Sequence, residues 1–534
     1  MSLLKTTYLG AIRGRSDGDV IEYLGIRYAT LSNRLAGAVL ITDLEGDELD
    51  ATREGPTAIS PQQGCDLEYS IMQKDLPKGD LPQSGTKCLN LNVTVPAGVD
   101  STSKLPVFVF IHGGGFNIGA NSWPQFNFAR FVKLSARLGL PVVAVTINYR
   151  LGPFGFLTSD ELREAGYKAN NGLHDQRVAL EWIWRHIADF GGDPDNVTLS
   201  GMSAGAASVL YHLSSDHVLF KRAIVMSGSH FLIQPLPLDL HEANYNRAMV
   251  ALGLSGASAE ERIRALLETP GHELLSRLPP SVISVPAVDS DFVSEPPTFA
   301  KVMDPNVDVP RGREWCKELM IGDAQMDGNI FRVMMPGAEE RCAERFIKIL
   351  NTTLSSKPKI AEDILRRYGI STDIPDEQAF SSILDYFNDI AFFAPTLATA
   401  AGWKSHAWVY YFNQGNSWEG PSKGRAGHLL DVVYLFQNFQ DFLTPDEQAL
   451  ATRFAGDIFK FCYSKSAWPA VDWRDLHRGF AARVYGSREV AKSEAIDILS
   501  PFHDESDRRK FLFDYRGEVS LDELIQVFYR FRGF

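Results

Sequence analysis

A series of short apolar runs, separated by longer segments of helical pattern, constrains the fold of this chain most strongly. The runs lie at 107–111, 142–148, 196–200, 222–227, 318–322 and 407–412. Uninterrupted apolar runs of this length are typical of strands that are buried on both faces of a parallel sheet. Between two of them, Leu180, Ile183 and Ile187 recur at helical spacing and define one apolar face. The alternation predicts an α/β fold, with a large, mostly parallel central sheet covered by helices on both faces.

We expect a single domain over residues 1–534. No internal repeat or low-complexity linker divides the chain. Two segments, at about 235–315 and 340–400, have helical and polar patterns without further buried strands. We interpret them as helical insertions over the sheet.

Charge and composition limit the possible partners. The formal net charge is −13 at pH 7, which argues against nucleic acid or an anionic membrane surface, since both attract basic faces. No apolar run has the roughly 20 residues of a membrane span, and the first residues lack the pattern of a secretory signal. We therefore expect a cytoplasmic protein that binds a small molecule. Five cysteines are too few for a disulfide scaffold, and nothing in the sequence indicates an oligomeric state.

The stretch "LSGMSAG" at 199–205 contains a G-x-S-x-G pattern around Ser203. The pattern alone is weak evidence, and a simple tight turn is the alternative interpretation. Its context is more specific, because it follows the strand predicted at 196–200 and precedes a helix that begins with small residues. A serine on a sharp strand-to-helix turn, with glycines where side chains would collide, is the nucleophile elbow of hydrolases.

A second glycine-rich stretch, "FIHGGGFNIG" at 110–119, also follows a predicted strand. Attack on an ester carbonyl places negative charge on oxygen, so backbone N–H groups must already point there. The amides of Gly114 and Gly115, with that of Ala204 after the serine, are candidates for this oxyanion hole. A phosphate-binding loop is the alternative, but the Gly-Lys-Ser/Thr that it requires is missing.

The base and the acid must come from elsewhere in the chain. Among twelve histidines, His428 stands in a glycine-containing loop after the strand predicted at 407–412, where such sheets place their chemistry. The acid should lie between the serine and the histidine, and the segment after the strand at 318–322 offers both Asp323 and Asp327. The residues alone leave that choice open. We expect no metal site and no cofactor, because no ligands cluster at metal-binding spacing.

Several stretches of this chain together resemble a known family. They lie, in chain order, at 23–29, 88–96, 112–116, 148–157, 170–209 and 428–436. The chain resembles the type-B carboxylesterases, which include cholinesterases and fungal lipases, over nearly its whole length, and it is most similar to intracellular members from filamentous fungi. The resemblance implies an α/β-hydrolase fold with a deep active site.

The resemblance also implies roles for individual residues. Ser203 matches the family nucleophile, His428 the base, and Gly114, Gly115 and Ala204 the oxyanion hole. The family acid precedes a glycine and lies four residues before an aromatic residue. In this chain that position is Asp327, which we favour over Asp323.

Departures from the family pattern bear on the substrate. The family usually has glutamate before the nucleophile, where this chain has Met202, and the loop at 65–88 lacks the tryptophan with which cholinesterases hold a quaternary ammonium. We therefore expect an uncharged ester or lactone, contacted by Met202, Phe116 and Trp123. Cys65 and Cys88 match a disulfide of secreted members and should stay reduced in a cytosolic protein.

The sequence thus predicts a serine carboxyl-ester hydrolase that works through an acyl-enzyme, with a fungal secondary metabolite as one candidate substrate. An acyltransferase or transesterase that uses the same triad is the alternative. A non-catalytic, neuroligin-like binding module is a third reading, which the presence of both Ser203 and His428 disfavours.

Overall fold

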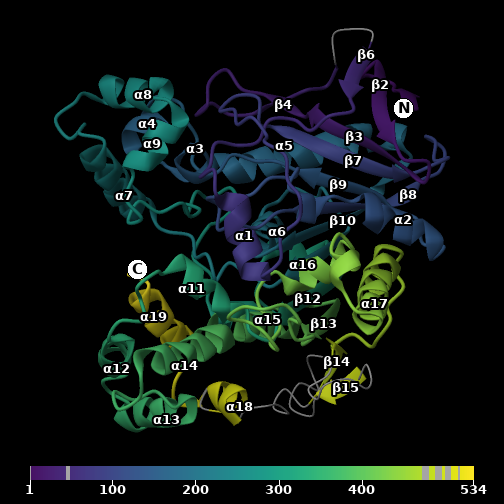
Figure 1. Ribbon diagram of the computed structural model, residues 1–534. Coiled ribbons are helices and arrows are strands. Elements are labelled where there is room, and N and C mark those ends of the chain that lie inside the picture. Colours follow the sequence, from purple (N-terminus) through teal and green to yellow (C-terminus); the bar gives the residue numbers. More distant parts are fainter. Residues whose placement is uncertain are drawn as a thin grey trace.

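A large twisted sheet runs through the centre of the protein (Figure 1). The computed structural model describes residues 2–43, 48–471, 480–486, 496–499, 507–514 and 517–533. Within these residues the sheet has 13 strands in the order β1-β2-β3-β7-β9-β8-β10-β11-β12-β13-β14-β15, with β6 beside β2. Its strands are β1 (Ser2–Lys5), β2 (Ala11–Ser16), β3 (Val20–Arg27), β6 (Glu48–Ala51), β7 (Asn90–Pro96), β8 (Leu105–Ile111), β9 (Val143–Ile147), β10 (Gly192–Met202), β11 (Arg222–Met226), β12 (Glu318–Ala324), β13 (His406–Phe412), β14 (Phe480–Tyr485) and β15 (Ile496–Leu499). A separate pair consists of β4 (Ala29–Thr30) and β5 (Val39–Leu40).

The seven strands from β9 to β14 in this order are parallel to one another. The remaining strands of the main order pair antiparallel with their neighbours, whereas β6 pairs parallel with β2. Each of the six apolar runs in the sequence forms one of the parallel strands, which confirms the predicted fold class. Strand β10 begins at Gly192, earlier than the predicted 196.

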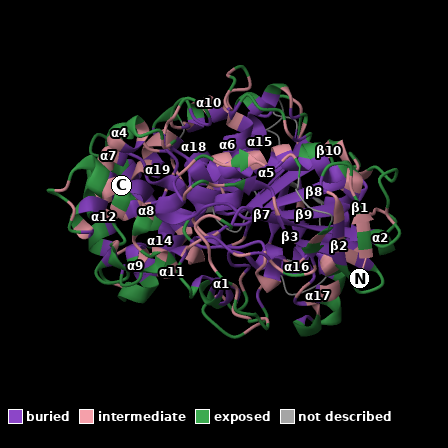
Figure 2. Ribbon diagram, turned by 90° about the horizontal axis from the view of Figure 1, so that it is seen from above, coloured by how far each residue is buried: buried purple, intermediate pink, exposed green. Residues whose placement is uncertain are grey.

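Helices cover both faces of the sheet (Figure 2). The α-helices of the described residues are α1 (Gly64–Met72), α2 (Ala129–Arg137), α3 (Gly152–Phe156), α4 (Asp160–Glu164), α5 (Asn171–His186), α6 (Ala204–Ser214), α7 (Leu238–Ala251), α8 (Ala259–Glu268), α9 (Gly271–Arg277), α10 (Phe299–Met303), α11 (Ile330–Met334), α12 (Cys342–Thr353), α13 (Pro358–Tyr368), α14 (Asp376–Asn388), α15 (Ala394–Ala401), α16 (Leu430–Leu435), α17 (Pro445–Cys462), α18 (Asp507–Asp514) and α19 (Leu521–Phe531).

Strand β8 shows how the two faces are built. Successive side chains of a strand point to opposite faces of the sheet. Val107, Val109 and Ile111 accordingly pack in one core with residues of α5 and α6. Phe108 and Phe110 pack in the other core with residues of α2, α16 and α17. Strand β8 is therefore buried on both faces of the sheet. Its uninterrupted apolar run predicts this.

The two segments predicted to be insertions are largely helical. The first contains α7 to α10 and the second contains α12 to α15. In Figure 1, α7, α8 and α9 lie at the upper left and α12, α13 and α14 at the lower left, whereas α15 lies next to β12 and β13. The division of the chain into domains stays a prediction. Among the described residues, none of the helices combines the length and the apolar character that crossing a membrane requires.

All five cysteines are free thiols and are buried. Cys65 lies on α1 and Cys88 just before β7. Burial raises the pKa of Cys65 to about 11 and that of Cys88 to about 12. Both side chains are therefore neutral thiols at physiological pH, the less reactive form of cysteine.

A buried ion pair ties the loop after β9 to α5. Arg150 and Asp175 are almost completely buried, and their side chains form two bonds of 2.7 Å. The backbone amide of Arg150 also donates to Asp175, and the guanidinium donates to the carbonyl of Ala36 at 2.7 Å. Arg150 thus joins three segments that are distant in the sequence.

We expect Asp175→Asn to lower the free energy of unfolding by about 3–5 kcal/mol, because it leaves a guanidinium buried without its counter-charge. Urea denaturation followed by tryptophan fluorescence measures this change. Asp441→Asn is the matched control, since Asp441 pairs with Arg130 on the surface, where such pairs contribute less than about 1 kcal/mol. Equal effects of the two substitutions would contradict the prediction.

Candidate active site

The turn between β10 and α6 places Ser203 in a conformation that non-glycine residues rarely adopt. Its φ is 56° and its ψ is −120°, which costs of order 1–3 kcal/mol and requires support from the surroundings. The backbone N–H of Ser203 donates to the carbonyl of Met226 on β11 at 2.9 Å. The neighbouring glycines are required sterically, because a Cβ on Gly201 would overlap the carbonyl of Gly205, and one on Gly205 would overlap that of Ile111.

The loop after β8 presents its glycines to the same space. Gly114 and Gly115 have φ values of 94° and 60°. The carbonyl of Gly114 accepts hydrogen bonds from the backbone amides of Asn117 and Ile118, and the carbonyl of Gly115 accepts one from the Asn117 side chain at 2.8 Å. Both carbonyls are thereby held within the loop. Ala204 is the first residue of α6, so its N–H has no acceptor within the helix.

The buried ring of His112 contacts the backbone of this glycine loop. Its ring stacks on Tyr149 with centroids 4.6 Å apart, and its Nδ1 lies 2.9 Å from the carbonyl of Gly113. Burial lowers the pKa of His112 to about 4, so the ring is neutral at physiological pH. We assign the proton to Nδ1, which then donates to the Gly113 carbonyl.

His428 lies in the loop before α16, and its ring is fixed by Asp327. The Nδ1 of His428 is 2.7 Å from Oδ1 of Asp327, and both side chains are buried. The second oxygen of Asp327 accepts from the backbone amide of Ala324 at 2.7 Å, and the backbone amide of His428 donates to Asn329 at 2.9 Å. The carboxylate therefore holds the imidazole with Nε2 left to face the cavity.

Asp323, the other acid that follows β12, is placed differently. It is buried, and neither of its carboxyl oxygens has a hydrogen-bond partner among the described residues. Burial raises the pKa of Asp323 well above its ordinary value, and the nearby charge of Arg509 only partly opposes this. Burial thus favours the protonated form of Asp323, whereas Asp327 is the acid that contacts His428.

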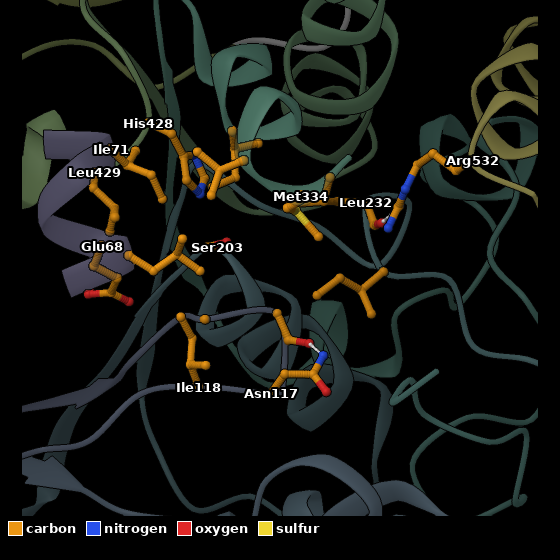
Figure 3. Close-up of a pocket in the computed structure, with 16 residues that line it drawn as sticks. Glu68, Ile71, Asn117, Ile118, Ser203, Leu232, Met334, His428, Leu429 and Arg532 are labelled. Atoms are coloured by element: carbon orange, nitrogen blue, oxygen red, sulfur yellow. Dashed lines mark hydrogen bonds between the residues drawn. The ribbon is translucent and has the colours of Figure 1, made fainter. Parts of the chain in front are cut away.

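A cavity of about 230 Å³ brings these groups together. Ser203, His428, Gly114 and Gly115 line it, and Figure 3 shows the serine and histidine side chains among the residues of its wall. Most of the remaining wall is apolar and consists of Leu67, Ile71, Ile118, Leu232, Ile233, Ile330, Val333, Met334 and Leu429. A largely apolar cavity with a few polar groups at one point is the usual form of a small-molecule site.

Three residues expected to contact the substrate do not line this cavity. Met202 ends β10 and is fully buried in the core beside Met226, because successive strand residues point to opposite sides. Phe116 is also fully buried and packs against Phe156, with ring centroids 4.4 Å apart. Trp123 stacks on Phe126 and packs against the core on the α2 side. The structure thus corrects the substrate-contacting set predicted from the sequence.

Three polar wall residues escaped the sequence analysis. Glu68 comes from α1, Arg532 follows the end of α19, and Asn117 lies in the glycine loop. Asn117 follows the HGGGF stretch directly, so its position in the sequence was a usable signal. Glu68 and Arg532 lie outside all of the motifs identified in the sequence. Only the tertiary packing of α1 and α19 brings them to the cavity.

Glu68 is a buried carboxyl with one satisfied oxygen. Its Oε2 accepts from Nε2 of Gln125 at 2.9 Å, whereas Oε1 has no partner among the described residues. Burial raises the pKa of Glu68 to about 7, although the hydrogen bond from Gln125 opposes the change. The folded protein therefore keeps this proton in a pH range where an unfolded chain, with a glutamate pKa near 4.3, has lost it.

Because the folded-state pKa is raised, stability contributed by the neutral Glu68 is lost as pH rises from about 4.3 to 7 and is constant above. We expect Glu68→Gln to stabilise the protein by about 3 kcal/mol at pH 8 and by less than about 1 kcal/mol at pH 5. Unfolding free energies at the two pH values measure this difference. Glu419→Gln, on an exposed carboxylate, is the control. A gain independent of pH would show that Glu68 titrates normally.

Comparisons with known proteins agree with this geometry. A sequence model described as "Carboxylesterase family" matches residues 2–471. The chain belongs to the carboxylesterase family. It is accordingly a carboxylic ester hydrolase with the α/β-hydrolase fold.

Individual relatives are similar over nearly the full length. The chain is 29% identical to "Lipase 3" of Yarrowia lipolytica over 523 residues, which are 94% of this chain and 95% of the relative. It is 29% identical to "Para-nitrobenzyl esterase" of Bacillus subtilis, over 96% of this chain and 99% of the relative. A solved structure of a PNB esterase superposes with a TM-score of 0.74 at 26% identity, over 96% of this chain and 99% of that one.

One relative is described as inactive. "Inactive carboxylesterase-like protein VdtD" of Byssochlamys spectabilis is 36% identical over 247 residues, which are 46% of this chain and 39% of the relative.

Proposed function

We propose that this carboxylesterase hydrolyses its substrate through a covalent acyl-serine intermediate on Ser203. One observation carries the proposal. Ser203, on its strained turn, lines the same cavity as His428, whose Nδ1 is paired with Asp327 at 2.7 Å. A nucleophile, a base and a group that orients the base are the three parts that this chemistry needs.

In the first half-reaction, His428 accepts the Oγ proton of Ser203 as Oγ attacks the carbonyl carbon. The resulting tetrahedral oxyanion accepts hydrogen bonds from the amides of Gly114, Gly115 and Ala204. When the intermediate collapses, the bond from carbon to the alcohol oxygen breaks, and His428 gives its proton to the departing alcohol. Asp327 keeps its charge throughout and stabilises the imidazolium.

In the second half-reaction, His428 accepts a proton from water as the water attacks the acyl-enzyme. Collapse breaks the bond to Oγ, the proton returns to Ser203, and the carboxylic acid leaves. The cycle balances with water as the only co-reactant.

The cavity favours an ester or lactone that carries no cationic group at the reacting end. Nine apolar side chains line it, and Met202 brings no carboxylate beside the serine. An uncharged ester group is desolvated cheaply against such a wall, whereas an ammonium is not. The same apolar wall supports the second candidate, acyl transfer, because an organic alcohol enters it more readily than water and resolves the same acyl-enzyme.

A non-catalytic role is a real alternative for a relative of an inactive protein. That relative, however, matches less than half of this chain. In this chain Ser203 and His428 line one cavity and Asp327 contacts His428. This arrangement supports hydrolysis over a purely binding function.

We expect p-nitrophenyl butyrate to acylate Ser203 and Ser203→Ala to lower kcat at least about 10³-fold. Stopped-flow release of nitrophenol, with mass spectrometry of the protein after a fluorophosphonate probe, measures both. Butanol added to the assay distinguishes the two enzymatic outcomes, since butyl butyrate forms only if an alcohol resolves the acyl-enzyme. Absence of both turnover and labelling at Ser203 would leave a binding function.

Asp327→Asn should reduce kcat by about 10³- to 10⁴-fold, because an amide no longer holds the imidazole in its correct tautomer or stabilises its charge. Asp323→Asn should change kcat by less than about threefold, because His428 bonds Asp327 and neither oxygen of Asp323 has a hydrogen-bond partner among the described residues. The two isosteric substitutions are compared at saturating ester, with circular dichroism to verify folding. The opposite ranking would assign the orienting role to Asp323.

A further inference from the structure

The backbone that carries His428 is held in a strained conformation. The residue after the histidine, Leu429, has a φ of 72° and a ψ of −6°, a left-handed conformation that is unfavourable for a leucine. Such a conformation persists only where the surrounding structure fixes it. Asp327 contacts the imidazole ring of His428, so the backbone of this turn requires a support of its own.

Asn329 provides contacts of this kind. The backbone amide of His428 donates to Oδ1 of Asn329 at 2.9 Å. The residue before the histidine, Gly427, packs directly against the same side chain, since a Cβ on Gly427 would lie 2.4 Å from Nδ2 of Asn329. Because a backbone N–H can only donate, the atom that faces His428 is the oxygen, and Nδ2 is left to donate to another group.

Ser422 accepts that second bond. Nδ2 of Asn329 donates to the hydroxyl of Ser422 at 2.7 Å, and the backbone amide of Ser422 donates to Oε1 of Gln73 at 2.5 Å. Gln73 directly follows α1, and its Nε2 donates to the carbonyl of Trp418 at 3.1 Å. A continuous series of hydrogen bonds thus runs from the end of α1 to the turn that carries His428.

A second contact ties the loop between β13 and α16 to the same helix. The buried side chain of Asn416 donates through Nδ2 to the carbonyl of Met72, the last residue of α1, at 3.0 Å. Helix α1 also lines the cavity through Leu67 and Ile71. The helix that forms part of the cavity wall therefore also holds the loop that leads to the base.

We infer that Asn329 is a positioning residue for His428, and that Ser422 and Gln73 hold Asn329 in place for this task. Asp327 orients the imidazole ring, whereas Asn329 fixes the backbone from which the ring projects. The inference rests on the proposed acyl-serine chemistry, which makes His428 the base. Misplacing a reacting group by about 1 Å can lower a rate about 10²-fold, so this support bears on the rate although Asn329 is not among the described residues that line the cavity.

The main test replaces Asn329 with leucine, which has a similar size and no hydrogen-bonding group in its side chain. We expect Asn329→Leu to lower kcat for p-nitrophenyl butyrate about 10- to 100-fold, because the base moves away from Ser203. KM should change less than about twofold, because binding of the ester is not altered. Values of kcat refer to active sites titrated with a fluorophosphonate. Unchanged kcat in a folded Asn329→Leu protein would overturn the inference.

Asn329→Asp is the conservative variant. A carboxylate oxygen accepts from the amide of His428 as the amide oxygen does, and the hydroxyl of Ser422 can donate to the second oxygen. We therefore expect Asn329→Asp to recover most of the kcat that Asn329→Leu loses. Equal losses in the two variants would show that the acceptor for the His428 amide is not what matters.

Asn244→Leu is the matched control. Asn244 lies on α7 and is buried, and its side chain bonds the backbone amide and carbonyl of Ile283 at 3.0 and 2.9 Å. Its substitution removes the same kinds of bond within the first helical insertion, so it should lower stability and leave kcat within about twofold. An equal fall of kcat in Asn244→Leu and Asn329→Leu would indicate a general effect of destabilisation.

A double-mutant cycle tests the link through Ser422. We expect Ser422→Ala to lower kcat about threefold or more in the wild type and to have almost no effect in Asn329→Leu, because substitutions within one hydrogen-bond network are not additive. Gln73→Leu should behave in the same way. Equal effects of Ser422→Ala in the two backgrounds would show that Ser422 acts independently of Asn329.

Proton NMR separates this inference from the proposed function. The Nδ1 proton in the bond between His428 and Asp327 gives a signal at low field that reports the geometry of that bond. We expect Asn329→Leu to shift or broaden this signal and Asn244→Leu to leave it unchanged. An unchanged signal in Asn329→Leu would refute the positioning role. If the wild type hydrolysed no ester, the proposed function would fail, and the NMR comparison would still decide the inference.

Discussion

The close approach of three backbone segments around Ser203 is the constraint on which the active site depends. The first turn of α6 lies against the carbonyl of Ile111 at the end of β8, which only a glycine at 205 permits. On the other side, a Cβ on Gly228, just after β11, would overlap the carbonyl of Ser203. Three adjacent parallel strands, β8, β10 and β11, therefore end within contact of one turn. The strained φ of Ser203 persists because this packing leaves the turn no other conformation.

The base and its partner reach this turn from the next strands of the same sheet. Strand β12 leads to Asp327 and β13 leads to the loop that carries His428. Strands β12 and β13 pair in parallel along their whole length. In the loops that follow them, the backbone amide of Met326 donates to the carbonyl of Ala426 at 2.8 Å. The spacing of parallel strands thus sets the distance between residues separated by about a hundred positions in the chain. The chemistry gathers at the carboxyl edge of the sheet, as it does in other open α/β folds.

The features that could be predicted from the sequence are those with local causes. The buried strands are recognisable in the sequence as apolar runs. The turn at Ser203 is recognisable by the glycines that its geometry requires. The choice between Asp323 and Asp327 needed the family pattern, because it depends on how the chain folds back so that Asp327 accepts from the amide of Ala324. Met202 was misplaced because the alternation of strand side chains continues to the last residue of β10. Glu68 and Arg532 were missed because only the docking of α1 and α19 brings them to the cavity.

The cavity wall and the reacting groups are carried by different parts of the fold. The reacting groups sit at strand ends, where the packing of glycines against carbonyls tolerates almost no change. Much of the wall comes from α1, α11 and the end of α19, whose side chains face the cavity from separate helices. Mutations in these helices can therefore accumulate without straining the turn. Divergence within the family is free to change what is bound while the bond that is broken stays the same.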